Sequence, residues 1–379
     1  MIDLSIYFQP IAPELLYTER QLGAQIKCYQ TDFPDLNESG CAIISIPEFR
    51  GASVDQYAVP AFRSALYQLH PETTWTKAIY DLGTIQPGAT IADTYFAVSN
   101  VVSELVKKNI LPIVIGGSQD LTMAIYQGYE RLEQLVNTCS IDRSIDIGSA
   151  EETLNSKNYL SHMLLQRPCY LFNHAIIGLQ QPYAAAAEHE LFEKLFFDIC
   201  RLGEFNQDFR LAEPHLRNAD IISVDIQSIK TADLGSSSGA PNGFTAAQFC
   251  QMMKYAGISD KVTSIGFFNE AALGQTGASL LAEGIWYFLQ GYFSRVGDFP
   301  FGSKADYTKF TVFMDEVSRE LIFYKSNKSA RWWMEVPYPP QEGSRYERHH
   351  LVPCNKSDYD NAMNNELPDL WWKTYQKLG

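Results

Sequence analysis

The sequence has few cationic residues for its size and no paired cysteine motif. It contains 30 Lys and Arg against 44 Asp and Glu, so its formal net charge is −14. An acidic surface of this kind repels phosphate backbones and anionic lipid, which argues against nucleic-acid and membrane partners. The 7 cysteines are an odd number and stand singly, with no Cys-x-x-Cys pair. This pattern excludes a metal knuckle and a disulfide framework.

Long apolar segments are also missing. No run approaches the ~18 apolar residues of a transmembrane helix, and residues 1–10 lack the basic region and long apolar run of a signal peptide. We therefore expect a cytoplasmic protein. With 46% hydrophobic and 20% charged residues, the 379-residue chain has the composition of a globular protein with one large domain or two ordinary ones.

Short β-branched runs alternate with longer amphipathic segments over the first 300 residues. The pattern predicts strands at 41–46, 110–115, 141–147, 175–179, 221–226 and 262–267, and helices at 90–108, 121–135, 157–166, 184–195, 246–256 and 278–293. Strands that are apolar on both faces and separated by helices indicate a parallel sheet with helices on each side. In such sheets the functional residues lie in loops at the carboxyl ends of the strands.

The pattern changes after residue 300. An antiparallel meander is predicted from the apolar runs 310–313, 321–324 and 332–336, joined by short polar links at 315–319 and 326–330. Four of the 6 tryptophans fall in this last part, which closes with an amphipathic segment at 368–378. We interpret residues 301–379 as a strand-rich, Trp-rich appendage on a main domain of residues 1–300.

A predicted strand runs through two glycines into polar residues at 113–120, Ile-Val-Ile-Gly-Gly-Ser-Gln-Asp. Gly116 and Gly117 allow a tight turn, and Ser118 or Asp120 can cap the helix that follows. A phosphate cradle is one interpretation, although the spacing matches neither Gly-x-Gly-x-x-Gly nor a P-loop. An oxidoreductase or nucleotide binder would use the same turn, but the acidic residue expected about 20 positions later at a separate strand end is missing.

Two further strand ends carry carboxylates. Asp142 and Asp146 are four residues apart, and Asp225 follows another apolar run. Like charges held close together need a cation or a basic partner. The aspartates would suit a hard, oxygen-liking metal; the alternatives are a solvated loop or neutralisation by Arg143. The Gly-, Ser- and Pro-rich stretch at 235–243 is long for a loop and indicates a functional rim.

In their order, these strand ends resemble the arginase and agmatinase (ureohydrolase) superfamily, which includes formimidoylglutamase. The family motif Gly-Gly-Asp-His-Ser falls on 116–120, Asp-Ala-His-x-Asp on 142–146, Ser-x-Asp-x-Asp on 223–227, and Gly-Thr-Pro-x-x-Gly-Gly-Leu-Thr, loosely, on 239–245. Residues 177–180 are similar to its Gly-Ile/Leu-Arg strand. The resemblance implies a three-layer α/β/α domain with a mostly parallel sheet of about eight strands.

The family binds two manganese ions through two His and four Asp, and this chain matches that set only in part. Gln119 and Ser144 stand at the His positions, and Gln227 stands at one Asp position. The resemblance implies that two manganese ions are not held. It leaves at most one divalent cation (Mg, Ca or Mn), bound by Asp142, Asp146, Asp225 and the amide oxygen of Gln119. The alternative is a metal-free pocket in which Arg143 and Lys230 neutralise the carboxylates.

The resemblance also bears on catalysis. Hydrolysis in the family uses a hydroxide that bridges two ions, and one ion generates that nucleophile poorly. The family's guanidinium-facing acid falls on Phe267, which cannot pair a guanidinium. Glu270 is the candidate substitute, and His162 is the candidate for a proton-shuttling His. Asn242 and Lys230 are the substrate-binding candidates.

Two functions are consistent with this pattern. The loss of three of the six ligands favours a non-hydrolytic pseudoenzyme that acts by binding or assembly, with a small molecule as its candidate partner. The surviving aspartates favour instead a divergent metal-dependent C–N hydrolase acting on a guanidino or formimidoyl substrate. Since the family commonly forms trimers and hexamers, the resemblance also implies a homo-oligomer.

Overall fold

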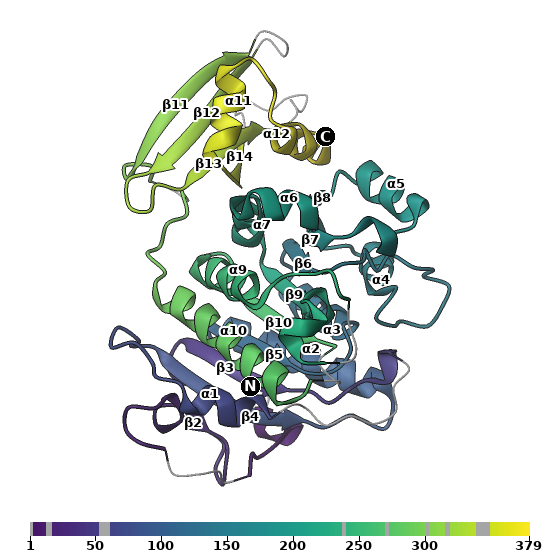
Figure 1. Cartoon of the computed structure of the whole chain (residues 1–379), viewed down its shortest axis with the longest axis vertical. Coiled ribbons are helices and arrows are strands. Elements are labelled where there is room, and N and C mark those ends of the chain that lie inside the picture. The colour runs from purple at the N-terminus through teal and green to yellow at the C-terminus, as the bar shows by residue number, and fades with distance from the viewer. Residues whose placement is uncertain are drawn as a thin grey trace.

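The computed structural model describes residues 3–12, 17–52, 61–236, 240–269, 273–300, 303–314, 319–338 and 349–379. Figure 1 shows a large α/β body and, beyond one end of its sheet, a smaller unit built from the last part of the chain. None of the helices in the described ranges combines the length and the hydropathy needed to cross a membrane.

A central sheet organises the body. In the described residues it has ten strands in the order β1-β4-β3-β5-β10-β9-β6-β7-β8, with β2 paired to β4. The strands are β1 (Phe8–Gln9), β2 (Lys27–Cys28), β3 (Gly40–Ser45), β4 (Ala78–Ile85), β5 (Ile110–Ile115), β6 (Val136–Ile141), β7 (Leu171–Leu179), β8 (Asp198–Arg201), β9 (Ile221–Asp225) and β10 (Ser264–Phe268). Only the pairing of β1 with β4 is antiparallel, so the mostly parallel sheet is confirmed. About eight strands were expected, and two of the ten that are described, β1 and β2, are only two residues long.

Helices cover both faces of this sheet. One apolar cluster includes residues of α1 (Phe62–Gln68), α6 (Leu202–Gln207), α7 (Ala212–Asn218), α9 (Ala246–Ile258) and α10 (Gln275–Phe293). The other includes residues of α2 (Ile91–Lys107), α3 (Leu121–Glu130), α4 (Tyr159–Leu165) and α5 (Ala186–Lys194). Along β5, Ile113 and Ile115 belong to the first cluster and Ile110 and Val114 to the second, as the alternation of a strand requires. The predicted three-layer architecture is therefore confirmed.

The strand ends differ in one respect from the prediction. The strand expected at 141–147 ends at Ile141, so Asp142 and Asp146 lie in the loop that follows β6. Asp146 has a φ of 53°, a left-handed backbone that cannot continue a strand. Gly116 and Gly117, with φ of 108° and 80°, make the tight turn expected after β5.

The C-terminal unit is an antiparallel sheet covered by two helices. Its strands run in the order β11 (Tyr307–Met314), β12 (Arg319–Ser326), β13 (Trp332–Pro337) and β14 (His349–Cys354), followed by α11 (Lys356–Met363) and α12 (Asp369–Leu378). Residues of the sheet, α11 and α12 share one apolar cluster. The predicted meander is confirmed; β14 and α11 were not predicted. The polar link expected at 315–319 lies mostly outside the described residues.

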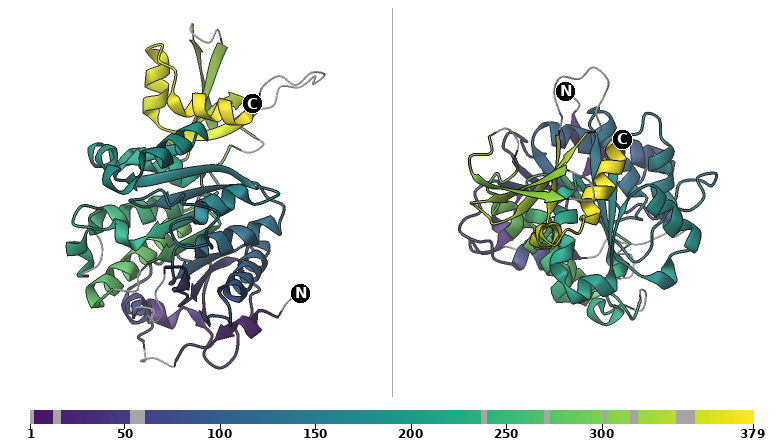
Figure 2. Two further views of the ribbon diagram at one scale, coloured as in Figure 1. Left: turned by 90° about the vertical axis from the view of Figure 1, so that its right-hand side faces the viewer. Right: turned by 90° about the horizontal axis from the view of Figure 1, so that it is seen from above.

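The C-terminal unit lies against the end of the body where Figure 1 labels β8, α6 and α7, and Figure 2 shows the unit on the same end from two other sides. Arg217 of α7 donates to the carbonyl oxygen of Cys354 at 3.1 Å, and its guanidinium lies 4.4 Å from the ring centroid of Trp333. Glu213, also on α7, is 3.0 Å from Arg217 and 3.3 Å from Arg331. Two strands of the small unit are therefore held by one buried guanidinium and its carboxylate.

Candidate functional site

Three loops bring polar side chains together at the carboxyl ends of neighbouring strands. In the sheet β5, β10, β9 and β6 are adjacent and parallel, so the residues that follow them meet at one edge. Gln119 follows β5, Asp142 follows β6, and Asp225 ends β9, and none of these side chains is more than 3% exposed. The structure thus brings together the residues that the sequence analysis assigned to one candidate site.

The side-chain amide of Gln119 links these strand ends. Its Nε2 donates to Oδ2 of Asp142 at 2.7 Å and lies 3.3 Å from Oγ of Ser223 and 3.4 Å from the hydroxyl of Tyr159. On the other side, Nδ2 of Asn269 donates to Oε1 of Gln119 at 3.5 Å. The amide therefore presents N–H groups, and not its oxygen, to the carboxylate of Asp142.

Ser144 connects the two carboxylates of its own loop. Its backbone N–H donates to Oδ1 of Asp142 at 2.9 Å. Its hydroxyl lies 3.2 Å from the same atom and 3.0 Å from Oδ1 of Asp146. Two aspartates that would otherwise repel each other are in this way held on either side of one shared hydroxyl group.

Burial and mutual repulsion shift the acidities of this group. Burial, and next the charge of Asp142, raise the pKa of Asp225 to about 7. Burial likewise raises the pKa of Asp146 well above its ordinary range, with Asp142 adding to the effect and Lys157 opposing it. The pKa of the buried Tyr159 phenol is also raised well above its ordinary value, first by burial and then by the aspartates. Protonation of a carboxyl in this group is therefore accessible near neutral pH.

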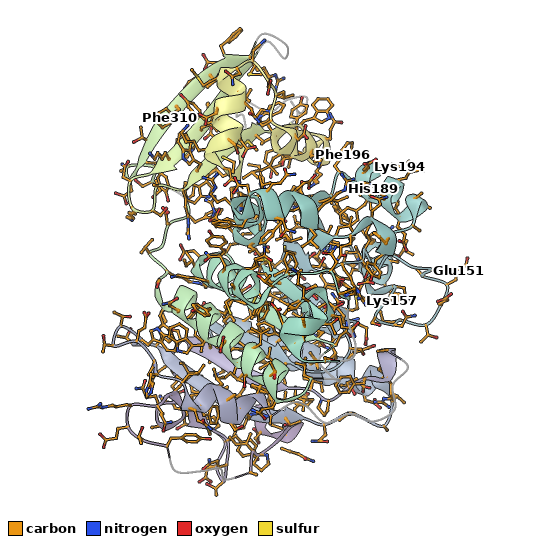
Figure 3. The ribbon with its side chains drawn as sticks, viewed as in Figure 1. Glu151, Lys157, His189, Lys194, Phe196 and Phe310 are labelled. Carbon is orange, nitrogen blue, oxygen red and sulfur yellow. The ribbon has the colours of Figure 1, made fainter. Side chains whose placement is uncertain are left out.

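The cation beside these carboxylates is Lys157, which the sequence analysis did not single out. Its Nζ is 3.7 Å from Oδ1 of Asp146, while its side chain is 70% exposed. Although burial works against the ammonium, the charges of Asp146, Asp142 and Asp225 raise its pKa. Figure 3 labels Lys157 on the side of the body where the loop that carries Glu151 projects.

Arg143 and Lys230, which were expected to neutralise the aspartates, have other contacts. Nη2 of Arg143 donates to Oε1 of Gln227 at 3.2 Å, and the guanidinium stacks on the ring of Tyr183 at 4.6 Å. Lys230 immediately precedes the short helix α8 (Thr231–Leu234), and its backbone N–H donates to the carbonyl of Phe244 at 2.9 Å. Within the part of the chain that is described, neither residue forms an ion pair with Asp142, Asp146 or Asp225.

The remaining candidates lie in different surroundings. Nε2 of His162, on α4, is 3.1 Å from the carbonyl oxygen of Glu152 in the preceding loop. Asn242 is exposed; its Nδ2 donates to Oε1 of Gln180 at 3.1 Å, and Nε2 of Gln180 donates to the backbone carbonyl oxygen of Asn242 at 3.1 Å. Phe267 is fully buried in β10. Glu270 lies outside the described residues.

Sequence reasoning missed four contributors to the site. Ser223 and Asn269 belong to stretches that the motif comparison had already aligned, so their positions were a usable signal. For Tyr159 and Lys157 the sequence carried no such signal, because they contact Gln119 and Asp146 from the helix and the loop that follow β6. No group of three or more His, Cys, Asp or Glu arranged to hold a metal ion occurs among the described residues.

Comparisons with known proteins place the chain in a family. The model of the arginase family matches residues 48–267, more than half of the chain. A formiminoglutamase variant of Trypanosoma cruzi, solved with Mn2+, is similar over 70% of this chain and 97% of its own, with a TM-score of 0.63 and 18% identity. The formimidoylglutamase of Bacillus subtilis is similar over 76% and 97%, with a TM-score of 0.65 and 14% identity.

An arginase of Bacillus subtilis is similar over 66% of this chain and 98% of its own, with a TM-score of 0.54 and 15% identity. No curated protein matches the sequence. At these identities the solved structures establish the fold alone, whereas the family model matches the segment that carries the three strand-end motifs. This chain therefore belongs to the arginase family.

Proposed function

We propose that this chain is a non-hydrolytic member of its family that acts by binding or assembly. The observation that carries the proposal is the hydrogen bond from Nε2 of Gln119 to Oδ2 of Asp142 at 2.7 Å. The N–H group takes one lone-pair site of this carboxylate, and the amide nitrogen, unlike an imidazole nitrogen, has no lone pair to offer a cation. At the position where the family motif has an imidazole, this chain has a donor that engages one of the remaining acidic residues.

The donor set does not fit the two-manganese centre implied by the family. Such a centre needs imidazole or carboxylate lone pairs directed at both ions. Ser144 directs a hydroxyl hydrogen at the aspartates, and Gln227 accepts from Arg143. Lys157 adds a cation 3.7 Å from Asp146. These contacts support a pocket whose carboxylates are satisfied by the protein itself.

Metal analysis and an amidine hydrolysis assay test the proposal together. We expect the purified wild-type chain to hold less than one equivalent of manganese and to release neither urea nor ammonia from guanidino or formimidoyl substrates. The triple variant Gln119→His, Ser144→His, Gln227→Asp should bind manganese more tightly, because it supplies the missing lone pairs. Two stoichiometric manganese ions in the wild type, together with turnover, would overturn the proposal.

A divergent hydrolase with one cation is the second candidate. It is supported by the three buried aspartates at the strand ends, whose oxygen atoms are ligands that a hard divalent cation prefers. If hydrolysis of any amidine is found, Asp142→Asn and Asp225→Asn must abolish it. Retention of that activity in both variants would remove this candidate.

Assembly, location and domain division belong to the same proposal. We propose that the chain is a cytoplasmic homo-oligomer with a small-molecule ligand and that its main domain ends near residue 300. Light scattering of the full chain tests the oligomer, since a monomeric mass at micromolar concentration would contradict it.

A further inference from the structure

Arg143 is an oriented guanidinium without a carboxylate partner in the described residues. Its Nη2 donates to the amide oxygen of Gln227 at 3.2 Å, and its Cζ lies over the ring of Tyr183, 4.6 Å from the ring centroid. Both partners are neutral, so they position the guanidinium without cancelling its charge. Stacking on an aromatic ring leaves the in-plane N–H groups of an arginine directed outward, where they can form a fork for an oxyanion.

The surroundings of Arg143 are tied together by hydrogen bonds from separate loops. The carbonyl oxygen of Arg143 accepts the backbone N–H of Gln180 at 3.1 Å. Gln180 is 7% exposed and shares two hydrogen bonds with Asn242. Gln227 comes from the 3-10 helix η6 (Ile226–Ser228) that follows β9, and Tyr183 from η4 (Gln181–Tyr183), which follows β7. The guanidinium is therefore preorganised, and less entropy is lost when a ligand binds.

This end of the sheet is more positive than the family motif at two positions. Gln227 stands where the family motif has an aspartate, and Arg143 where that motif has an alanine. The half-buried Arg143 directly follows the fully buried Asp142, so the cation is nearer to solvent than the carboxylate. An incoming ligand therefore meets a positive group before it meets the aspartates.

We infer that Arg143 is the anchor of an oxyanion subsite at this end of the sheet, which takes the carboxylate or phosphate group of a small molecule. The inference rests on the proposed binding function, because the subsite adjoins the same aspartates. The subsite needs no metal and no chemical step. The subsite can therefore be disproved while the protein is still found to be non-hydrolytic, and hydrolysis can be found while the subsite still binds its ligand.

Calorimetric titration of the full chain tests the subsite. The probes are glutarate for the carboxylate source and inorganic phosphate for the phosphate source, each up to about 10 mM. Binding of either probe by the wild type, with a loss of about tenfold or more in Arg143→Gln, supports the subsite and identifies its ligand group. Arg143→Lys should recover only part of the affinity, because an ammonium keeps the charge and lacks the planar fork.

Arg131 provides a matched control. Its guanidinium also lies over an aromatic ring, Phe96 at 5.1 Å, and also donates to an amide oxygen, that of Asn100, but it lies at the end of α3. Arg131→Gln should bind the probes as the wild type does. Tyr183→Leu keeps the charge, removes the stacking and should weaken binding by a smaller factor, which provides a second test if Arg143→Gln does not fold. The inference is overturned if neither probe binds the wild type, or if Arg131→Gln loses as much affinity as Arg143→Gln.

Discussion

Asp146 lies near the start of one projecting loop and Lys157 near its end, and Nζ of Lys157 is 3.7 Å from Oδ1 of Asp146. The loop therefore folds back on itself, and the ammonium group near its end lies beside the aspartates near its start. An ammonium at this position repels any divalent cation that approaches the same carboxylates. The pair is consequently a direct way to test whether the site excludes metal ions.

We predict that Lys157→Met increases the affinity of the chain for Mg2+ or Mn2+ by about two- to fivefold. The gain is small because the lysine is largely exposed and its charge is screened by solvent. Calorimetric titration with each metal measures it. Lys356→Met is the control, since Lys356 is also exposed and pairs with Asp360 at 2.6 Å far from the site. An unchanged affinity in Lys157→Met would show that the ammonium does not compete with a cation.

We predict that Gln119→Leu lowers the free energy of unfolding by about 1–3 kcal/mol. The substitution removes the donor to Asp142 and leaves a fully buried carboxylate oxygen without that hydrogen bond. Urea denaturation at neutral pH measures the change. Gln127→Leu, at a half-buried position on α3, is expected to change stability by less than about 0.5 kcal/mol. Equal effects of the two substitutions would contradict the structural role of the Gln119 amide.

Acid should destabilise the protein through His174. This ring is buried on β7 between the hydroxyls of Thr138 at 2.6 Å and Ser140 at 3.2 Å. Burial lowers its pKa from 6.5 to about 3; the charge of Lys377 adds to the shift and that of Asp198 opposes it. Because the unfolded chain binds a proton that the folded chain excludes, the stability is complete above pH 6.5 and falls below it.

Between pH 7 and pH 5.5, His174 alone should reduce the free energy of unfolding by about 1.3 kcal/mol. Urea denaturation at both pH values measures the slope, and His174→Asn should reduce it by that amount. Other groups contribute to the wild-type slope. His350, whose pKa burial lowers to about 4, adds to it, and Asp225, whose pKa burial raises to about 7, opposes it, so the test is the difference in slope between the wild type and His174→Asn. If the stability of His174→Asn depended on pH as strongly as that of the wild type, His174 would not be the group responsible.

Arg217→Ala should loosen the C-terminal unit. Arg217 is 4% exposed and supports Cys354, Trp333 and Glu213 at once. Its loss should destabilise the chain by about 2–4 kcal/mol, at the lower end for a buried ion pair because Arg331 still lies 3.3 Å from Glu213. Limited proteolysis should then release the segment that follows residue 300 faster.

Arg210→Ala is the control for Arg217. Arg210 is exposed and pairs with Asp208 at 2.8 Å, so its removal should cost less than about 1 kcal/mol. Arg217→Lys should rescue only part of the stability, because an ammonium cannot stack on Trp333 and donate in plane as a guanidinium does. Proteolysis at the wild-type rate in Arg217→Ala would show that the contact does not hold the unit in place.

The fold could be predicted where the apolar pattern was continuous. The strand at 110–115 is apolar throughout, and the structure has β5 at Ile110–Ile115. The strand β4 was missed because Asp81 lies within it, buried and paired with Arg63 at 2.7 Å, so its sequence pattern resembles a polar loop. At 141–147 the apolar residues Ile145 and Ile147 gave the sequence the pattern of a strand, but the left-handed backbone of Asp146 prevents a strand from forming there.

The candidate site divides in the same way. Asp142, Asp146 and Asp225 were found from their positions after strands, because parallel strands place their carboxyl ends at one edge of the sheet, and Gln119 was found from the resemblance to the family motif. The partners of these residues were not predicted. Gln119 contacts Ser223, which is 104 residues away in the sequence, and Tyr159, which is 40 residues away. Propensity and periodicity describe neighbours in the chain, and these contacts form only when separate loops meet.

The sequence by itself determined the parallel α/β architecture, the carboxylates at its strand ends and the replacement of the family's imidazoles by Gln119 and Ser144. The tertiary structure decided which groups satisfy those carboxylates. It directs the N–H of Gln119 at Asp142 and brings Lys157 to Asp146, while it holds Arg143 against Gln227 and Tyr183. The physical reason is that residue identity sets charge and hydrogen-bonding capacity, whereas the partner of a long polar side chain depends on distances that only the assembled loops define.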